Sequence, residues 1–234
     1  MDEFTLRIFR FDPEDGQEPR FDAYRVPYRD GMTVLEALFE VLDHQDGSIA
    51  FRFSCRGAVC GACAMFINGS HRLACQTQVK SLGPEVTVSP LPHLPVIRDL
   101  IVDMEPFWRK YEEIKPYLIA NSEPPEKERP QDPEDRKKID EMINCILCGA
   151  CYSSCPMVWT GEDYLGPAAL LKAYRFVADS RDDASEERLA VVSTEKGVWR
   201  CHTVFNCAEV CPRSINITWS LQQLKKLAVR KALF

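Results

Sequence analysis

The cysteines constrain this chain of 234 residues more than any other feature, because there are eleven of them and they fall into two groups. One group runs from Cys55 to Cys75 and the other from Cys145 to Cys211. Complete internal disulfide pairing is impossible with an odd number of cysteines. The acidic N-terminus also lacks the layout of an export signal, and disulfides are rare in reducing compartments. We therefore expect these cysteines to bind metal.

The first group has the spacing C-x4-C-x2-C followed by one further cysteine, and its members are Cys55, Cys60, Cys63 and Cys75. This is the plant-type spacing of a 2Fe–2S cluster. Gly57 and Gly61 allow the loop to curl closely around inorganic sulfide, and backbone N–H groups can then donate to the sulfur atoms. Arg52 and Arg56 either offset the charge of the cluster or are simply solvated. A zinc site is the alternative, but zinc sites usually use paired C-x2-C motifs.

The second group begins with the spacing C-x2-C-x2-C-x3-C-P, formed by Cys145, Cys148, Cys151 and Cys155-Pro156. In two-cluster bacterial ferredoxins the fourth cysteine of such a run binds the other cluster, so a complementary set must follow. That set consists of Cys201, Cys207 and Cys211-Pro212. When this set is aligned with the C-x2-C-x2-C-x3-C-P spacing, only the cysteine at position 204 is missing, and the chain has Val204 there.

The crossover of ligands divides the second group between two clusters. A complete 4Fe–4S cluster is assigned to Cys145, Cys148, Cys151 and Cys211. The remaining three, Cys155, Cys201 and Cys207, leave one corner of their cluster without a ligand, because valine cannot bind iron. The sequence therefore predicts a 3Fe–4S cluster at this third site, and all eleven cysteines are then used.

Hydrophobic patterns predict a different fold for the two halves of the chain. Alternating apolar residues, an Asn-Gly turn and a capping box predict strands at 4–8, 21–26, 64–67, 72–75 and 85–89 and a helix at 33–42. Helices are expected at 92–118, broken by Pro106 and Pro116, and at 133–143, 168–178, 186–192 and 218–233. We expect an α+β chain, with a β-grasp plant-type ferredoxin domain over 1–100 and an all-helical bacterial-ferredoxin-like domain over 101–234. A Pro- and Glu-rich stretch at about 121–135 predicts an exposed connector.

In combination, these motifs resemble the iron–sulfur subunit of succinate dehydrogenase and fumarate reductase, the respiratory complex II family. The shared pattern is a plant-type cysteine set followed by bacterial-type sets with one aliphatic replacement. Similar segments cover nearly the whole chain: SCRG at 54–57, CGAC at 60–63, CYSSCP at 151–156, DYLGPA at 163–168, SRDD at 180–183 and RCHT at 200–203. Each motif alone is only a ferredoxin signal, whereas the combination is specific to the family.

The resemblance implies an electron-transfer subunit of a succinate:quinone oxidoreductase or quinol:fumarate reductase. Its partners would be a flavoprotein with covalent FAD, which performs the substrate chemistry, and a membrane anchor of cytochrome b type, with haem where the anchor carries it. Electrons from succinate would pass through the 2Fe–2S, 4Fe–4S and 3Fe–4S clusters in that order to a quinone.

By the same resemblance, Pro156, Trp159 and His202 lie close to the quinone. A structural or packing role is the alternative for Trp159 and for His202. Thr160 replaces the second tryptophan of many relatives, which would suit an anchor whose quinone is reached through haem.

Charge and hydropathy limit the remaining classes of partner. The net charge of -6 and the pI of about 5.4 argue against a nucleic-acid surface, which needs a concentrated basic face. No apolar run reaches the ~18–20 residues that span a bilayer. We therefore expect a peripheral protein on the cytoplasmic face of the inner (cytoplasmic) membrane, held there by partner subunits. The alternatives are a free multi-cluster electron carrier and an iron–sulfur subunit of a heterodisulfide-reductase-like complex, and Val204 argues against the latter.

Overall fold

The computed structural model describes residues 2–233, with side chains placed as far as residue 231, and the chain forms two compact units. The first unit contains Met1–Met104 together with Ile146–Ser153, and the second contains Glu105–Cys145 together with Ser154–Phe234. The units therefore do not coincide with the ranges 1–100 and 101–234, because a short piece of the second cysteine group belongs to the first unit.

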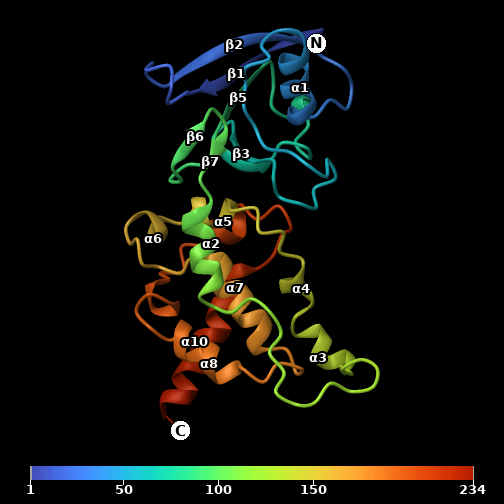
Figure 1. Ribbon diagram of the computed structural model, residues 1–234. Helices are drawn as coiled ribbons and strands as arrows, with labels where there is room; N and C mark the ends of the chain where they lie inside the picture. Colours follow the sequence, from blue (N-terminus) through green and yellow to red (C-terminus); the bar gives the residue numbers. More distant parts are fainter. Residues whose placement is uncertain (1, 234) are drawn as a thin grey trace. The chain divides into compact units, whose positions relative to one another are not determined.

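A five-stranded sheet forms the frame of the first unit (Figure 1). Its strand order is β2-β1-β5-β3-β4, with β1 parallel to β5 and the other neighbours antiparallel. The strands are β1 (Glu3–Arg10), β2 (Arg20–Pro27), β3 (Ala64–Ile67), β4 (Ser70–Leu73) and β5 (Glu85–Ser89). Phe4, Leu6 and Ile8 are at most 1% exposed, which confirms the alternation predicted for the first strand.

Two local signals of the sequence form the elements they predict. The helix α1 (Val34–His44) begins with a capping box, in which Thr33 Oγ1 accepts from the Glu36 N–H and the Glu36 carboxylate accepts from the Thr33 N–H. Asn68 and Gly69 both have positive φ, 45° and 76°, as a type I′ turn between β3 and β4 requires. The return strand begins at Ser70 rather than at residue 72, because this turn needs only two residues.

The prediction of a helix from residue 92 onward is wrong for its first part, because residues 96–102 form a β-hairpin instead. β6 (Val96–Arg98) pairs with β7 (Ile101–Val102), and within the expected range only α2 (Glu105–Glu112) is an α-helix. Prolines at positions 92 and 95 oppose a helix, and Asp99 turns the chain with a φ of 45°. Because β7 lies beyond residue 100, the range 101–234 is not all-helical.

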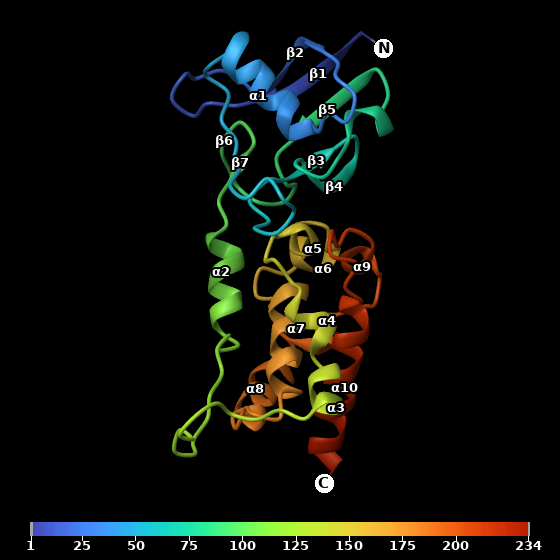
Figure 2. The ribbon, with the colours of Figure 1, turned by 90° about the vertical axis from the view of Figure 1, so that its right-hand side faces the viewer.

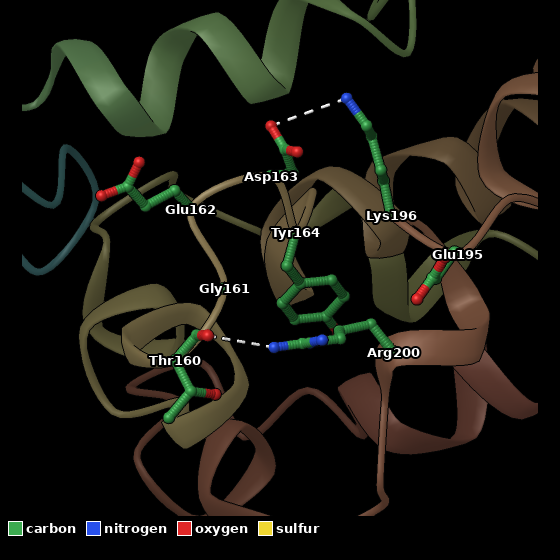
Figure 3. Close-up of a pocket in the computed structure, with 8 residues that line it drawn as sticks. All are labelled: Thr160, Gly161, Glu162, Asp163, Tyr164, Glu195, Lys196 and Arg200. Atoms are coloured by element: carbon green, nitrogen blue, oxygen red, sulfur yellow. Dashed lines mark hydrogen bonds and ion pairs between the residues drawn. The ribbon is translucent and has the colours of Figure 1, made fainter.

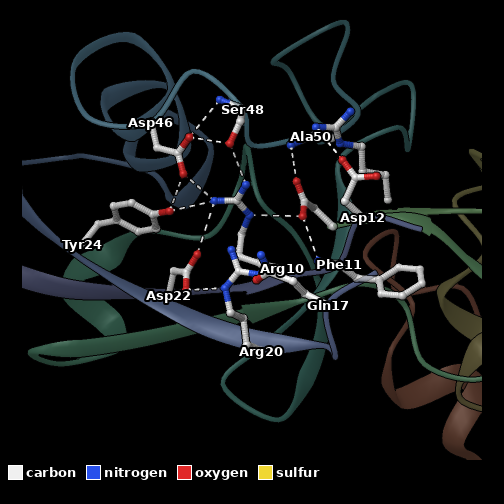
Figure 4. A network of polar contacts seen from close by, with 12 residues as sticks. Arg10, Phe11, Asp12, Gln17, Arg20, Asp22, Tyr24, Asp46, Ser48 and Ala50 are labelled. Carbon is white, nitrogen blue, oxygen red and sulfur yellow. Dashed lines mark hydrogen bonds and ion pairs between the residues drawn. The ribbon is translucent and has the colours of Figure 1, made fainter. Parts of the chain in front are cut away.

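Arg10 of the first strand lies within a polar network (Figure 4), and its buried ion pair with Asp99 fastens this hairpin to that strand. Arg10 Nε donates to Asp99 Oδ1 over 3.1 Å, and the two side chains are only 8% and 2% exposed. The remaining nitrogens of the guanidinium are bonded to Tyr24, Asp46 and Ser48. Hydrogen bonds to the guanidinium nitrogens offset part of the cost of burying this charge.

Helices form the second unit, in which α7 (Gly166–Val177) and α10 (Ile217–Leu233) lie side by side (Figure 2). Leu170 and Leu171 of α7 and Leu221 and Leu224 of α10 are fully buried and form the centre of this unit. The other helices of the unit are α2, α3 (Pro133–Lys137), α4 (Asp140–Ile143), α6 (Pro156–Trp159), α8 (Ser185–Val192) and α9 (Asn206–Glu209), with a 3-10 turn η2 (Val198–Arg200). Among residues 2–233, no helix is long and apolar enough to cross a membrane.

The helix expected over 133–143 is interrupted, so that α3 and α4 are separate. At Ile139 the backbone leaves helical values, with φ of -115°, and the side chain is fully buried. Residues 134–143 contain no proline or glycine, so the sequence gives no local signal for this break.

Arg188 of α8 anchors residues 114–119, the segment that follows α2, through hydrogen bonds. Its side chain is 1% exposed, and Arg188 Nε donates to the carbonyl of Ile114 over 3.1 Å. The guanidinium also pairs with the buried Asp182, which in turn accepts from the Ile119 N–H over 3.0 Å. Beyond this anchored segment, residues 121–132 form no helix or strand, and most of them are exposed.

Candidate iron–sulfur centres

The four cysteines of the first set all belong to the first unit and gather around the start of the β3–β4 hairpin. They are Cys55, Cys60, Cys63 and Cys75. Cys63 directly precedes β3 and Cys75 follows β4, so strand pairing brings them together, and the Ala74 N–H donates to Cys63 O over 3.0 Å. On the preceding loop, the Cys55 N–H donates to Cys60 Sγ over 3.5 Å.

The backbone of this loop surrounds the Cys55 sulfur with hydrogen-bond donors. The N–H groups of Gly57, Val59 and Cys60 donate to Cys55 Sγ over 3.4, 3.3 and 3.3 Å. Arg56, with φ of 55°, turns the backbone so that these groups point inward. The hydrogen bonds lower the pKa of the Cys55 thiol to about 6. The loop therefore favours the thiolate, which is the form that binds iron.

At Cys63 the thiol is favoured over the thiolate, because this side chain is buried. Burial raises the pKa of its thiol to about 12, and the side chains of Cys75 and Cys60 add to this effect. Neighbouring thiolates in a site with little water repel one another unless positive charge lies between them, which iron supplies. Four thiols in one region with N–H donors aimed at sulfur fit a 2Fe–2S cluster.

Arg56 lies over aromatic rings beside the same loop. Its guanidinium carbon is 4.8 Å from the centre of the Phe39 ring and 5.7 Å from that of Phe53. The two rings meet edge to face, with centres 4.7 Å apart. Cation–π contacts therefore hold one positive charge next to Cys55. For Arg52, the choice between charge compensation and simple solvation stays open.

The three cysteines of the third set come together within the second unit. Cys155 precedes α6, Cys201 follows η2 and Cys207 lies in α9. Burial raises the pKa of Cys207 to about 11, and the charges of Cys155 and Cys201 act in the same direction. Burial also raises the pKa of Cys155, again with a contribution from Cys201. Buried thiols that sense one another's charge fit a cluster whose iron offsets that charge.

Val204 occupies the loop between Cys201 and Cys207. Its side chain is 44% exposed, and the residues on either side, Thr203 and Phe205, have positive φ values of 60° and 64°. A valine side chain has no atom that can donate to iron. The third set therefore offers three thiols and no fourth ligand at the position where the template would place one.

The four cysteines assigned to the 4Fe–4S cluster are divided between the units. Cys148 and Cys151 belong to the first unit, and Cys145 and Cys211 belong to the second. Within the second unit, the Ile215 N–H donates to Cys211 Sγ over 3.5 Å. Across residues 2–233, no three Cys, His, Asp or Glu side chains converge as the ligands of a single metal ion do. The assignment of these four to one cluster stays a prediction from their spacing.

Within the first unit, the segment 146–153 packs against the loop of the first set. Gly61 has a φ of 74°, and a Cβ atom there would lie 2.8 Å from Cys148 Cβ and 2.9 Å from Ile146 O. Ser153 Oγ donates to Pro92 O over 2.6 Å and lies 3.0 Å from His71 Nε2. The pKa of that histidine is lowered to about 4 by burial. These contacts fix the segment on the first unit.

A pocket of about 440 Å³ opens in the second unit (Figure 3). It is lined by Thr160, Gly161, Glu162, Asp163, Tyr164, Glu195, Lys196 and Arg200. Arg200 reaches across it and donates to Thr160 O over 3.1 Å, while Lys196 pairs with Asp163 at 3.5 Å. Both pairs link the loop after α6 to the chain just before Cys201.

The three residues expected near a quinone do not line this pocket. Pro156 is the first residue of α6, Trp159 is its last residue and is 44% exposed, and His202 is an exposed residue next to Cys201. Their proximity to a quinone stays a prediction.

Two hydroxyl groups beside the third set were not found from the sequence. Tyr164 is 2% exposed and lies near the three cysteines of this set. Its pKa is raised by burial and then by the charges of Cys201, Cys155 and Cys207. Thr218 Oγ1 lies 3.7 Å from Cys207 Sγ. Neither residue belongs to a spacing motif, although Tyr164 lies inside the DYLGPA segment.

A sheet unit that carries the first cysteine set, together with a helical unit that carries the third, defines an iron–sulfur electron-transfer protein. Residues 5–109 match the family described as "2Fe-2S iron-sulfur cluster binding domain". Residues 141–215 match the family described as "4Fe-4S dicluster domain". The chain is therefore an α+β protein with a 2Fe–2S domain followed by a 4Fe–4S domain.

Similarity over nearly the full length identifies the family more closely. The succinate dehydrogenase iron-sulfur subunit of Paracoccus denitrificans is 42% identical over 226 residues, covering 96% of this chain and 87% of that protein. That of Coxiella burnetii is 45% identical over 224 residues, covering 94% and 95%. A chain of the Mycobacterium smegmatis Sdh1 complex superimposes with a TM-score of 0.85 at 28% identity, covering 99% of this chain and 98% of that one. The chain belongs to the family of succinate dehydrogenase iron–sulfur subunits.

Proposed function

We propose that this chain conducts electrons between a flavoprotein subunit and a membrane quinone through 2Fe–2S, 4Fe–4S and 3Fe–4S clusters, in that order when succinate is oxidised. Its residues hold the clusters, keep water away from the buried thiolates and donate hydrogen bonds to sulfur. The proposed ligands are Cys55, Cys60, Cys63 and Cys75 for 2Fe–2S, Cys145, Cys148, Cys151 and Cys211 for 4Fe–4S, and Cys155, Cys201 and Cys207 for 3Fe–4S.

The observation that carries the proposal is the division of the eleven cysteines into sets of four, four and three with none left over. The N–H donors around Cys55 support the first set. For the third set, support comes from the charge interaction among its buried thiols and from Val204 at the vacant position of the template. Membership of the family supports the whole scheme.

The family also supports the nature of the partners. A flavoprotein with covalent FAD interconverts succinate and fumarate, and a membrane anchor of cytochrome b type, with haem where it carries one, presents the quinone. The chain then lies peripherally on the cytoplasmic face of the inner membrane. Pro156, Trp159 and His202 adjoin the third set and are the residues proposed to approach the quinone.

Replacement of Val204 by cysteine tests the assignment of the third set. In the complex isolated anaerobically, we expect V204C to convert the third cluster toward 4Fe–4S, because the vacant corner gains a thiolate. The EPR signal of the oxidised 3Fe–4S cluster should largely disappear, and the iron content should rise by one atom per chain. V229C is the matched control, since Val229 lies on α10 and is also 44% exposed. An undiminished 3Fe signal in V204C would refute the ligand assignment, and zinc in place of iron would refute the proposed function.

A further inference from the structure

The first turn of α10 places a buried hydroxyl beside a cysteine of the third set. Thr218 is 3% exposed, Cys207 is 9% exposed, and Thr218 Oγ1 lies 3.7 Å from Cys207 Sγ. When the sulfur is bound to iron it carries no proton, so the hydroxyl must be the donor and the thiolate the acceptor. The contact then becomes a hydrogen bond to a charged sulfur atom.

The hydroxyl of Thr218 is not needed to cap the helix on which it lies. Asn216 performs that role, because its Oδ1 accepts from the Trp219 N–H over 3.0 Å. A threonine near a helix start usually bonds to nearby backbone. Here the hydroxyl points to a sulfur atom eleven residues away along the chain.

The same face of α10 contacts the loop that carries the third set at two further points. Gln222 Nε2 donates to Thr203 Oγ1 over 3.0 Å, and Lys225 Nζ donates to Cys201 O over 2.8 Å. Thr218, Gln222 and Lys225 are spaced i, i+4 and i+7, which places them on one side of a helix. This polar face therefore fixes α10 against the part of the loop that contains Cys201 and Thr203.

Reduction of a cluster adds negative charge to its sulfur atoms. A donor aimed at sulfur stabilises the reduced state more than the oxidised state, and so raises the reduction potential. The effect is larger where water is absent, because no solvent competes for the sulfur. Burial of both partners meets this condition.

We propose that Thr218 is a positioning residue of the third cluster, whose hydroxyl donates to the Cys207 thiolate and holds the reduction potential of that cluster high. This inference rests on the proposed function, since it takes Cys207 to be an iron ligand. A high potential at the third site favours the delivery of electrons to the end of the chain of clusters. Tyr164, beside Cys201, supplies a second hydroxyl to the same set.

A redox titration of the native complex tests the proposal, with the EPR signal of the oxidised 3Fe–4S cluster as readout. In T218V, which keeps the shape but loses the hydroxyl, we expect the equilibrium constant for reduction to fall about threefold to tenfold, where tenfold corresponds to about 59 mV for one electron. T218S keeps a hydroxyl and should retain most of the wild-type potential. S220A is the control, because Ser220 is a fully buried hydroxyl on the same helix whose Oγ has no hydrogen-bond partner among the described residues.

The outcomes separate this inference from the proposed function. If wild-type complex has no 3Fe–4S signal, the ligand assignment itself fails. If the signal is present and T218V titrates like wild type, or if S220A shifts as far as T218V, the role of Thr218 is refuted. If T218V does not assemble the cluster, T218A and T218S provide the same comparison. Loss of the cluster in T218S, which keeps the hydroxyl, would show that the hydroxyl is not what the site requires, and would also refute the proposal.

Discussion

Asp99 joins three segments of the first unit through its two carboxylate oxygens. Oδ1 accepts from Arg10 Nε and from the Phe11 N–H, at 3.1 and 2.9 Å, and Oδ2 accepts from the Ala50 N–H at 2.8 Å. Ala50 lies a few residues before Cys55, so this carboxylate also fixes where the loop of the first set begins. The other hydrogen bonds of Arg10, to Tyr24, Asp46 and Ser48, are drawn in Figure 4.

We expect Asp99→Asn to destabilise the first unit by about 1–3 kcal/mol, because the new amide NH2 must face an N–H donor in either orientation, although Asp46 still pairs with Arg10. Hydrogen exchange of the β1 and β6 amides measures the loss. Tryptophan fluorescence would not report the unfolding of the first unit, because all four tryptophans belong to the second unit: Trp108, Trp159, Trp199 and Trp219. Glu85→Gln is the control, because its 3.4 Å pair with Arg7 is exposed and should contribute less than about 1 kcal/mol. Equal effects of the two substitutions would contradict the prediction.

The residues of the sites differ in how far the sequence predicts them. The cysteines are predicted because cluster ligation demands thiolates at fixed spacing, and spacing is a property of the sequence. The roles of Thr218 and Asp99 are not predicted by the sequence, because their partners are far away along the chain. In the sequence, each looks like an ordinary surface residue. Only folding brings Thr218 to Cys207, or Asp99 to Arg10.

At the scale of elements, Gly61 allows two cysteine-bearing loops to touch. A Cβ atom there would clash with Cys148 and Ile146, and all three residues belong to the first unit. Under the proposed ligand assignment, this contact sets the separation between the first cluster and one ligand of the second. The glycine is needed for close approach as well as for its positive φ.

We expect Gly61→Ala to push the two loops apart, at a cost of about 1–3 kcal/mol. The reduced 2Fe–2S cluster should then relax more slowly, because the neighbouring cluster is farther away, and its EPR signal should saturate at lower microwave power. Gly69→Ala is the matched control: Gly69 has a φ of 76°, close to the 74° of Gly61, but no atom lies within 4 Å of its added Cβ. If the microwave-power saturation of the 2Fe–2S signal changed equally in both variants, backbone strain, and not the contact with Cys148 and Ile146, would explain the change.

Elements are predicted where a local signal determines them and missed where tertiary contacts do. The capping box at Thr33 and the Asn68-Gly69 turn act within a few residues, and both appear as expected. The hairpin of β6 and β7 is held by Asp99 and is too short to show a pattern of its own. Likewise, nothing in the cysteine spacing indicates that the segment 146–153 belongs to the first unit.

At the scale of the whole molecule, the packed cores and the cysteines occupy different elements. No cysteine lies in β1, β5, α7 or α10, each of which contains fully buried apolar residues. Most cysteines of the second group lie instead in or beside α5 (Ala150–Ser153), α6 and α9, each of only four residues, whereas Cys145 follows α4 and Cys201 follows η2. Helices this short are not stable by themselves and need outside constraints.

Removal of iron and sulfide should therefore loosen the chain unevenly. We expect amides of α5, α6, α9 and the loop 51–60 to exchange with solvent at least about tenfold faster in the cluster-free chain, because binding energy at these sites is also folding energy. Amides of β1, β5, α7 and α10 should keep most of their protection, since apolar burial alone stabilises them. Hydrogen exchange with mass spectrometry of the full-length chain, before and after anaerobic chelation, measures both groups in one experiment. If α7 and α10 lost protection as much as α6 and α9, the clusters would be holding the whole second unit together, and its leucine core would not suffice.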